Sequence, residues 1–418
     1  MPAEFHRKQA RVVLAALTFV LVSRAEAQLT APVGLAPAGT PVQEAVPGFF
    51  LGGILSTAYD SNVTQLPQGA GAQGSSIDSA TLLAIYDHTY ERQHISASAD
   101  VSRIIYRQYD LYDYTAEDLR GELKSSFASD INTDISIARS QRLAQEEYLN
   151  TIRRNLIATD TAKAAIYLPV AAEWHAVVAG NGTELRNSNP IDQPTNLDTA
   201  EADLGARYQT GAQNYIDLLA RGARSTYPNG SLSGYEDASF NDRGADLRVN
   251  WRFAASSQIL GHVGYTERRY PNLPILDFSG PAYELLYTLA PAYKTLLTLY
   301  GLRQAGSVGD SGYLAGVTHT YRFTPAYLPT EKVRLEAYYQ WSSFDYYANI
   351  QVLAPGQPLS VASTNRYDTD SNYGLAATWN PFRWLMLKLE AHREQRSSNI
   401  SSFDFSERVT RLSAQAKF

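Results

Sequence analysis

Charged side chains recur at every second position along several segments of the chain, a spacing that places them on one face of a β-strand. Side chains of this kind can bind ions, hydrogen-bond polar solutes, or pair with one another across neighbouring strands. Eight of them are basic and seven are acidic, so the set is close to electrical balance. They are Arg120, Glu122, Lys124, Glu201, Asp203, Arg207, Asp246, Arg248, Arg252, Lys332, Arg334, Glu336, Lys388, Glu390 and Glu394.

Catalytic or metal chemistry has little support in the sequence. Cys is absent, which excludes thiolate ligands, cysteine nucleophiles, disulfides and lipid attachment through an N-terminal Cys. Neither G-x-S-x-G nor H-E-x-x-H occurs, and Asp60-Ser61-Asn62 supplies too few oxygen ligands for a Ca²⁺ site, so a turn is its favoured role. We predict no enzyme activity, no metal and no cofactor. The seven histidines are scattered, at His6, His88, His94, His175, His262, His319 and His392.

The overall charge argues against a nucleic-acid partner. The chain has 36 Lys and Arg against 42 Asp and Glu, a net charge of -6 at pH 7, and no block of basic residues. A protein that follows the phosphates of a nucleic acid needs a clustered basic surface. We therefore expect no nucleic acid to bind.

The first 48 residues have the composition of a targeting segment followed by a linker. Residues 1–27 combine a basic start, an apolar run over 12–22 and Ala25-Glu26-Ala27, the pattern of a cleaved secretory signal peptide. That run is about half of the roughly 20 residues that a membrane-spanning helix needs, so an anchor is disfavoured. Residues 28–48, rich in Pro and Ala, are expected to form a flexible periplasmic leader. Residues 49–418 are predicted to form a single domain.

From residue 49 onward the dominant hydrophobic period is two, which indicates β-strands. In the segment 332–342, Val333, Leu335 and Trp341 fall on one face, whereas Arg334 and Glu336 fall on the other. The segments 119–124, 200–208, 245–253 and 385–392 alternate in the same way. The sequence therefore predicts strands with one apolar face and one polar face.

Either a soluble β-sandwich or a membrane barrel can bury such a pattern. Many candidate strands have 10 to 15 residues, longer than the usual five or six of soluble sheets. Short links also alternate with longer loops rich in Gly, Pro, Asn and Ser, which is typical of outer-membrane barrels. We predict an all-β fold, a transmembrane antiparallel outer-membrane β-barrel of eighteen strands, with sixteen as the alternative count. The longer loops are expected over 60–78, 144–160, 187–196, 227–240, 270–280 and 348–367, and one of the short links over 324–331.

The last segment of the chain agrees with a barrel. Leu412, Ala414, Ala416 and Phe418 alternate with polar residues, and an aromatic residue closing such a strand is what outer-membrane barrels present to the barrel assembly machinery. Tyr is abundant, with 28 residues, and clusters near expected strand ends, as in the aromatic belts at membrane interfaces. We expect this machinery and the outer-membrane lipids to be partners.

Three short stretches resemble a known family. They are Phe50-Leu51-Gly52 followed by Tyr59-Asp60-Ser61-Asn62, the segment 265–270 followed by 277–281, and the segment 393–398 followed by 403–405. Together they resemble the β-barrel porin 2 family of Gram-negative outer-membrane proteins, over nearly all of the mature chain. Members of that family often accompany exopolysaccharide or capsule export machinery, and the family has no agreed catalytic residues.

Three functions follow from these patterns as hypotheses. The resemblance implies a conduit that assists exopolysaccharide or capsular polysaccharide export, with periplasmic export proteins and the polysaccharide as partners. The alternative is a passive porin for small hydrophilic solutes, and the second alternative is a structural or adhesin barrel without transport. We expect the charged residues above to line the lumen, where a balanced set suits neutral cargo, because anion selectivity needs one sign of charge. They can equally pair across strands and stiffen the wall.

Overall fold

The computed structural model describes residues 48–418, except 68, 128–130, 145–153, 213, 230–237, 309–312, 352–359 and 363–365. The predicted signal peptide and all of the predicted leader except Gly48 lie outside the described residues. Among the described residues, no helix is long and apolar enough to cross a bilayer.

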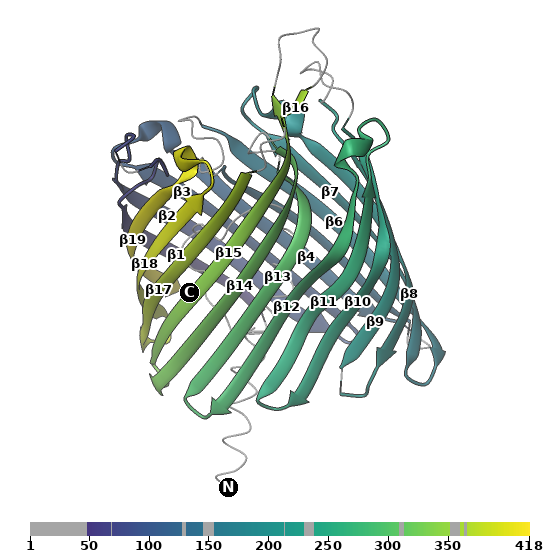
Figure 1. The fold of residues 1–418 in the computed structure, drawn as a ribbon. Helices are drawn as coiled ribbons and strands as arrows, with labels where there is room; N and C mark the ends of the chain where they lie inside the picture. The colour runs from purple at the N-terminus through teal and green to yellow at the C-terminus, as the bar shows by residue number, and fades with distance from the viewer. Residues whose placement is uncertain are drawn as a thin grey trace.

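The described chain consists almost entirely of β-strands, joined into one antiparallel sheet (Figure 1). Four 3-10 turns lie in the described parts of the loops. The strands are β1 Gly48–Asp60, β2 Ser75–Tyr90, β3 Gln93–Tyr106, β4 Tyr114–Ser126, β5 Asn132–Leu143, β6 Leu156–Ala171, β7 Trp174–Asn187, β8 Leu197–Gln209, β9 Tyr215–Thr226, β10 Phe240–Ala254, β11 Ser257–Arg269, β12 Phe278–Ala292, β13 Thr295–Val308, β14 Tyr313–Thr330, β15 Val333–Gln351, β16 Ser360–Ala362, β17 Arg366–Phe382, β18 Leu385–Ser398 and β19 Phe405–Lys417. The turns are η1 Asp110–Tyr112, η4 Gln193–Thr195, η6 Pro274–Leu276 and η8 Ser401–Phe403.

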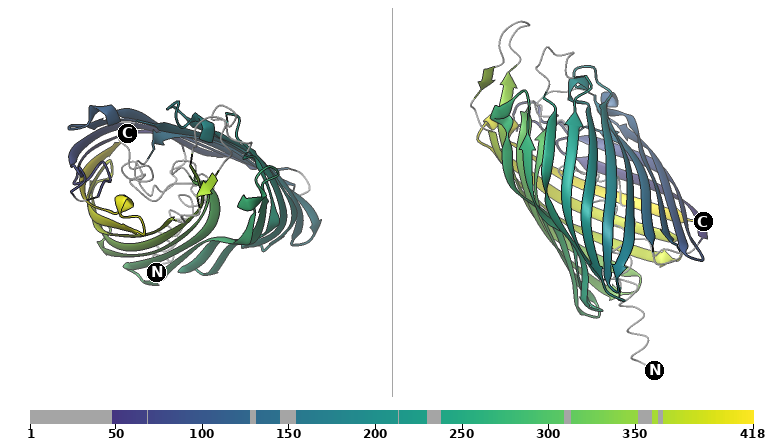
Figure 2. Two further views of the ribbon diagram at one scale, coloured as in Figure 1. Left: turned by 45° about the horizontal axis from the view of Figure 1, so that its top comes forward. Right: turned by 90° about the vertical axis from the view of Figure 1, so that its right-hand side faces the viewer.

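The sheet closes on itself. β1 pairs with β2 on one side and with β19 on the other, so the described wall is a complete ring (Figure 2). The three-residue β16 pairs only with the end of β15, and β15 pairs directly with β17. The other eighteen strands, of 12 to 19 residues, form the wall, which confirms the predicted count.

The two ends of the barrel differ in their connections. At one end, links of two to five residues join β2 to β3, β4 to β5, and so on to β17 and β18. At the other end most of the links have six to fourteen residues. Several predicted links were too long, since β2 already begins at Ser75 and β6 at Leu156. In the predicted short link 324–331, β14 continues to Thr330, and Pro325 lies opposite Leu297 of β13. The prolines of this segment predict a loop. A β-strand nevertheless tolerates a proline at a position where its nitrogen is not needed as a hydrogen-bond donor to the neighbouring strand.

The apolar faces of the strands point out of the barrel. Leu247 is 43%, Leu335 is 44% and Leu389 is 52% exposed, whereas Asp246, which precedes Leu247, is only 5% exposed. A soluble barrel would bury these leucines in its centre. A closed barrel with an exposed apolar wall must be surrounded by lipid instead, because lipid removes that surface from water.

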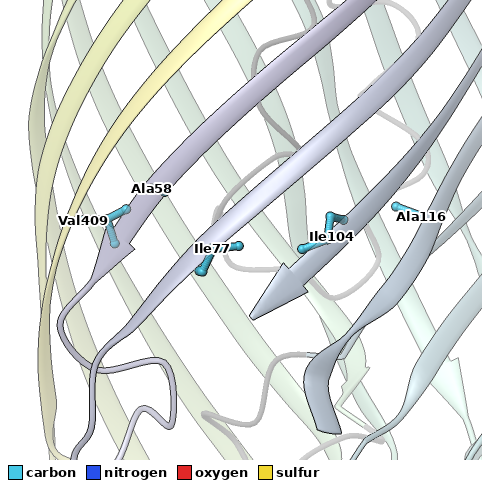
Figure 3. Packing of buried hydrophobic residues seen from close by; sticks show 5 residues of the cluster. All are labelled: Ala58, Ile77, Ile104, Ala116 and Val409. Carbon is cyan, nitrogen blue, oxygen red and sulfur yellow. The ribbon is translucent and has the colours of Figure 1, made fainter. Parts of the chain in front are cut away.

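The inner face is less uniformly polar than the sequence predicts. Ala58, Ile77, Ile104, Ala116 and Val409 pack together on β1, β2, β3, β4 and β19 (Figure 3). All five are less than 10% exposed, and exposed residues adjoin several of them in sequence. The inner face of these strands therefore carries a patch of packed apolar side chains near the long-loop end.

Four loops at the long-loop end close in the same way. In each, a 3-10 turn is followed by an Asp or Asn that lies directly before the next strand. Its side chain accepts a hydrogen bond from the backbone N–H at the end of the preceding strand, which fixes the loop over the strand ends. The pairs and distances are Asp113 with Tyr106, 2.8 Å; Asn196 with Asn187, 2.8 Å; Asp277 with Tyr270, 2.7 Å; and Asp404 with Ser398, 2.6 Å.

Candidate functional site

The candidate site is the charged inner face of the barrel wall. The guanidinium of Arg248 on β10 donates to Asp203 on β8 at 2.6 Å, so it reaches across the intervening β9. Asp203 and Asp246 are 7% and 5% exposed, whereas Leu204 and Leu247, the next residues along β8 and β10, are 63% and 43% exposed. Because successive side chains of a strand point to opposite faces and these leucines face lipid, the two carboxylates and Arg248, which pairs with both, project into the barrel.

A four-membered network occupies the inner face of β8, β10 and β11. Arg248 lies between two carboxylates, donating to Asp203 at 2.6 Å and to Asp246 at 3.0 Å. Asp246 also pairs with Nδ1 of His262 at 2.9 Å. Both carboxylates are buried against the wall, at 5% and 7% exposed. One guanidinium is thus held by two carboxylates and offers no isolated positive charge.

A second cluster surrounds Arg207 near the short-turn end. The guanidinium forms a bidentate pair with Asp217, at 2.6 and 2.7 Å. It also lies over the rings of Tyr167 and Tyr215, at 4.0 and 3.9 Å from their centroids. Two rings and a carboxylate fix this side chain, because the planar guanidinium is suited to both kinds of contact.

Most of the other predicted lining residues are also paired. The structure brings together Lys124 with Glu122 at 2.7 Å, Arg120 with Asp118 at 2.7 Å, Arg334 with Glu336 at 2.5 Å, Lys388 with Glu390 at 2.6 Å, Glu394 with Asn372 at 2.6 Å, and Glu201 with Arg221. Arg252 and Lys332 lie apart from these pairs. Arg252 is exposed next to the β10–β11 turn, and the ammonium of Lys332 donates to the backbone of Pro381 at 3.1 Å. These two belong to the short-turn rim.

Several residues of these clusters were missed by the sequence analysis. Tyr167, Asp217 and His262 lie on β6, β9 and β11, whose alternation is less regular than that of the five segments used for the prediction. Tyr fits either face of a membrane strand, so its position on one face could not be read from its type.

Near the long-loop end, two arginines are buried in ion pairs. Arg366 and Asp368 are completely buried and pair with each other, and the Arg366 guanidinium lies 3.5 Å from the centroid of the Phe403 ring. Arg268 forms a bidentate pair with Asp242, at 2.7 and 2.8 Å, under the ring of Phe240. A buried charge is tolerated only when it is paired in this way, so Asp368 and Asp242 offset the cost of burying the two arginines.

A metal centre has no support in the described part of the chain, where no three His, Asp or Glu side chains are grouped closely enough to hold an ion. The Asp60-Ser61-Asn62 stretch forms a turn, in which the N–H of Asn62 donates to the carboxylate of Asp60 at 2.8 Å. That carboxylate is engaged by the backbone in the way expected of an Asx turn.

A closed antiparallel barrel with an apolar outer wall, a polar inner face and loops longer at one end is the architecture of outer-membrane β-barrels, and the protein belongs to that class. No protein-family model matches the chain, and no curated protein matches it. The resemblance to the β-barrel porin 2 family therefore stays a prediction.

Three solved structures are among those with a strand arrangement similar to that of this chain. The outer membrane protein OpdK from Pseudomonas aeruginosa has a TM-score of 0.47 and 10% identity, with 88% of this chain and 99% of that chain covered. OccK2 (OpdF) from the same organism has a TM-score of 0.47 and 9% identity, covering 89% and 97%. The FrpB iron transporter from Neisseria meningitidis has a TM-score of 0.45 and 8% identity, covering 89% and 83%. Similarity at this level says nothing about cargo.

Proposed function

We propose that the protein is a passive channel that lets small hydrophilic solutes diffuse across the outer membrane. An eighteen-stranded barrel encloses an interior too wide for wall side chains to fill, so an aqueous path remains unless loops occupy it. Charged and hydroxyl groups on the inner face supply hydrogen bonds that replace part of a solute's hydration. The apolar outer wall separates this path from lipid.

The observation that carries the proposal is the pairing of the inner charges. Arg207 is held by Asp217, and Arg248 is held by Asp203 and Asp246. Paired charges produce only a weak field along the barrel axis, whereas a row of one sign would concentrate one sign of ion. We therefore expect uncharged solutes such as small sugars to pass, with little preference between small anions and cations.

Planar-bilayer recordings on the purified full-length protein test the proposal. Stepwise conductance in KCl is expected, with a reversal potential close to zero in a salt gradient. Liposome swelling with neutral sugars of increasing size gives the size limit. The absence of both conductance and swelling would contradict a channel, and a strong anion or cation preference would contradict the role of the paired lining.

Polysaccharide export, which the family resemblance implies, stays a prediction and makes a different demand. A strain lacking the protein would lose surface polysaccharide while its uptake of small solutes changed little. A passive channel predicts the reverse. A structural or adhesin barrel predicts neither change, so one deletion strain separates all three functions.

A further inference from the structure

Two arginines lie directly opposite each other on the lipid-facing side of the wall. Arg393 of β18 is the register partner of Arg408 of β19. The outward direction follows from alternation: Leu389 and Leu412 are another register pair on the same face, 52% and 53% exposed, whereas Glu394 and Val409 on the inner face are buried.

Such a pair is unfavourable by itself. The Cβ atoms of opposed residues in an antiparallel pair lie about 5 Å apart, and like charges at that distance repel. In the described part of the chain no carboxylate forms an ion pair with either arginine. On the lipid-facing side of β10 and β11, by contrast, a carboxylate neutralises two arginines. Glu267 pairs there with Arg243, at 3.0 Å, and with Arg269. Among the described residues, the positive charge of Arg393 and Arg408 therefore lacks a carboxylate counterion.

The pair also lies at the height of a lipid headgroup. Along the lipid face of β18, Leu385, Leu387, Leu389 and Ala391 precede Arg393, so apolar residues end where the arginine begins. Eight residues rise about 27 Å along a strand, or about 20 Å along the membrane normal at a tilt of about 40°. This is close to the roughly 25 Å of the usual apolar band. The arginines lie toward the long-loop end of the barrel, which is the outer side of such barrels.

We propose that Arg393 and Arg408 bind a phosphate group of lipid A, the phosphorylated lipid of the outer leaflet. A phosphate supplies the missing negative charge, and two guanidinium groups can each donate two N–H bonds to its oxygens. Tyr373 is the register partner of Arg393 on β17, and its ring is 44% exposed on the same face. An aromatic ring beside the arginines provides an amphipathic surface at the boundary between headgroups and acyl chains. The site lies outside the barrel and does not depend on the proposed channel activity.

Thermal unfolding of the purified full-length protein in detergent, with and without added diphosphoryl lipid A, tests the proposal. Lipid A is expected to raise the unfolding temperature of the wild type. In R393Q/R408Q the affinity for lipid A is expected to fall about tenfold or more, because the two charged donors to the phosphate are lost. The matched control, R243Q/R269Q, removes the same charge from the same face and keeps the affinity. Equal weakening in both double variants would mean a general charge effect and would overturn the site.

The source of the phosphate is tested with three further probes. Dephosphorylated lipid A, phosphatidylglycerol vesicles and inorganic phosphate are each expected to leave the unfolding temperature of the wild type unchanged. A shift of equal size with any one of them would overturn the assignment to lipid A. If R393Q/R408Q does not fold, R393Q and R408Q are measured singly, and wild-type affinity in both would also overturn it. Bilayer conductance is expected to be the same in folded R393Q/R408Q and the wild type.

Discussion

Ser61 and Arg408 exchange two hydrogen bonds at the seam where the first and last strands of the barrel meet. The N–H of Ser61 donates to the carbonyl of Arg408 at 3.0 Å, and the N–H of Arg408 donates to the Ser61 hydroxyl at 2.8 Å. At the other end of the seam, the N–H of Phe418 donates to the carbonyl of Leu51 at 2.8 Å. The ladder between β1 and β19 closes the barrel, and Ser61 extends it by these two bonds at the long-loop end.

Asn62→Ala is expected to weaken this closure. Asn62 is 1% exposed, and its amide donates to the carbonyls of Leu66 and Ser406, at 2.9 and 3.2 Å. Removing the amide leaves these two half-buried carbonyls without that donor, which costs about 1 to 3 kcal/mol in the free energy of unfolding. Urea unfolding in lipid vesicles measures the loss. Asn241→Ala, at an exposed position on the lipid face, is the control and is expected to change little, and equal losses in the two variants would refute the role of Asn62.

Asp217→Asn is expected to make the channel prefer anions. The substitution removes the carboxylate that pairs with Arg207, so an uncompensated positive charge remains on the inner face. We expect the anion-to-cation permeability ratio to rise about twofold or more. The reversal potential in a KCl gradient measures it. Asp277→Asn, in the β11–β12 loop, is the control, and an unchanged ratio in Asp217→Asn would place Arg207 outside the conducting path.

Asp368→Ala is expected to destabilise the long-loop end strongly. Asp368 and its partner Arg366 are both completely buried, so the substitution leaves a buried guanidinium without its carboxylate. Loss of one partner of a buried pair costs roughly 3 to 5 kcal/mol. The comparison is Asp78→Ala, since the Asp78–Arg107 pair is exposed and such pairs contribute roughly 0 to 1 kcal/mol. The free energy of unfolding measures both, and a similar small loss in each would contradict the prediction.

The β11–β12 loop is expected to loosen in acid. The hydrogen bond from the N–H of Tyr270 and the nearby Arg269 guanidinium hold the pKa of Asp277 below its ordinary value of 3.8. A carboxyl whose pKa is depressed by folding stabilises the folded form above its unfolded pKa, and this stability is lost as the pH falls through the folded pKa. Hydrogen exchange at the Tyr270 amide should therefore speed up below about pH 4, beyond its intrinsic pH dependence. In Asp277→Asn this extra dependence should disappear, and its persistence would point to another titrating group.

Much of the fold follows from the sequence because a barrel strand is a local pattern. The alternation of Val333, Leu335 and Trp341 with Arg334 and Glu336 depends only on the two-residue period of a strand. The number of such segments and the lengths of the links between them then predict eighteen strands. Proline indicates a loop when the neighbouring strands are not considered. For this reason the extension of β14 to Thr330 was missed.

The partners of each side chain were not legible in the sequence. Alternation assigns Arg248 and Asp203 to polar faces, but they meet only because β8, β9 and β10 are adjacent in a particular register. Likewise, period two places Arg393 and Arg408 on a lipid-facing side without revealing that they are opposite each other. The sequence by itself predicted one apolar and one polar face for each regularly alternating segment, since that pattern depends only on neighbours along the chain. Only the tertiary structure decided which charges are neutralised, because pairing is set by strand register between segments distant in sequence.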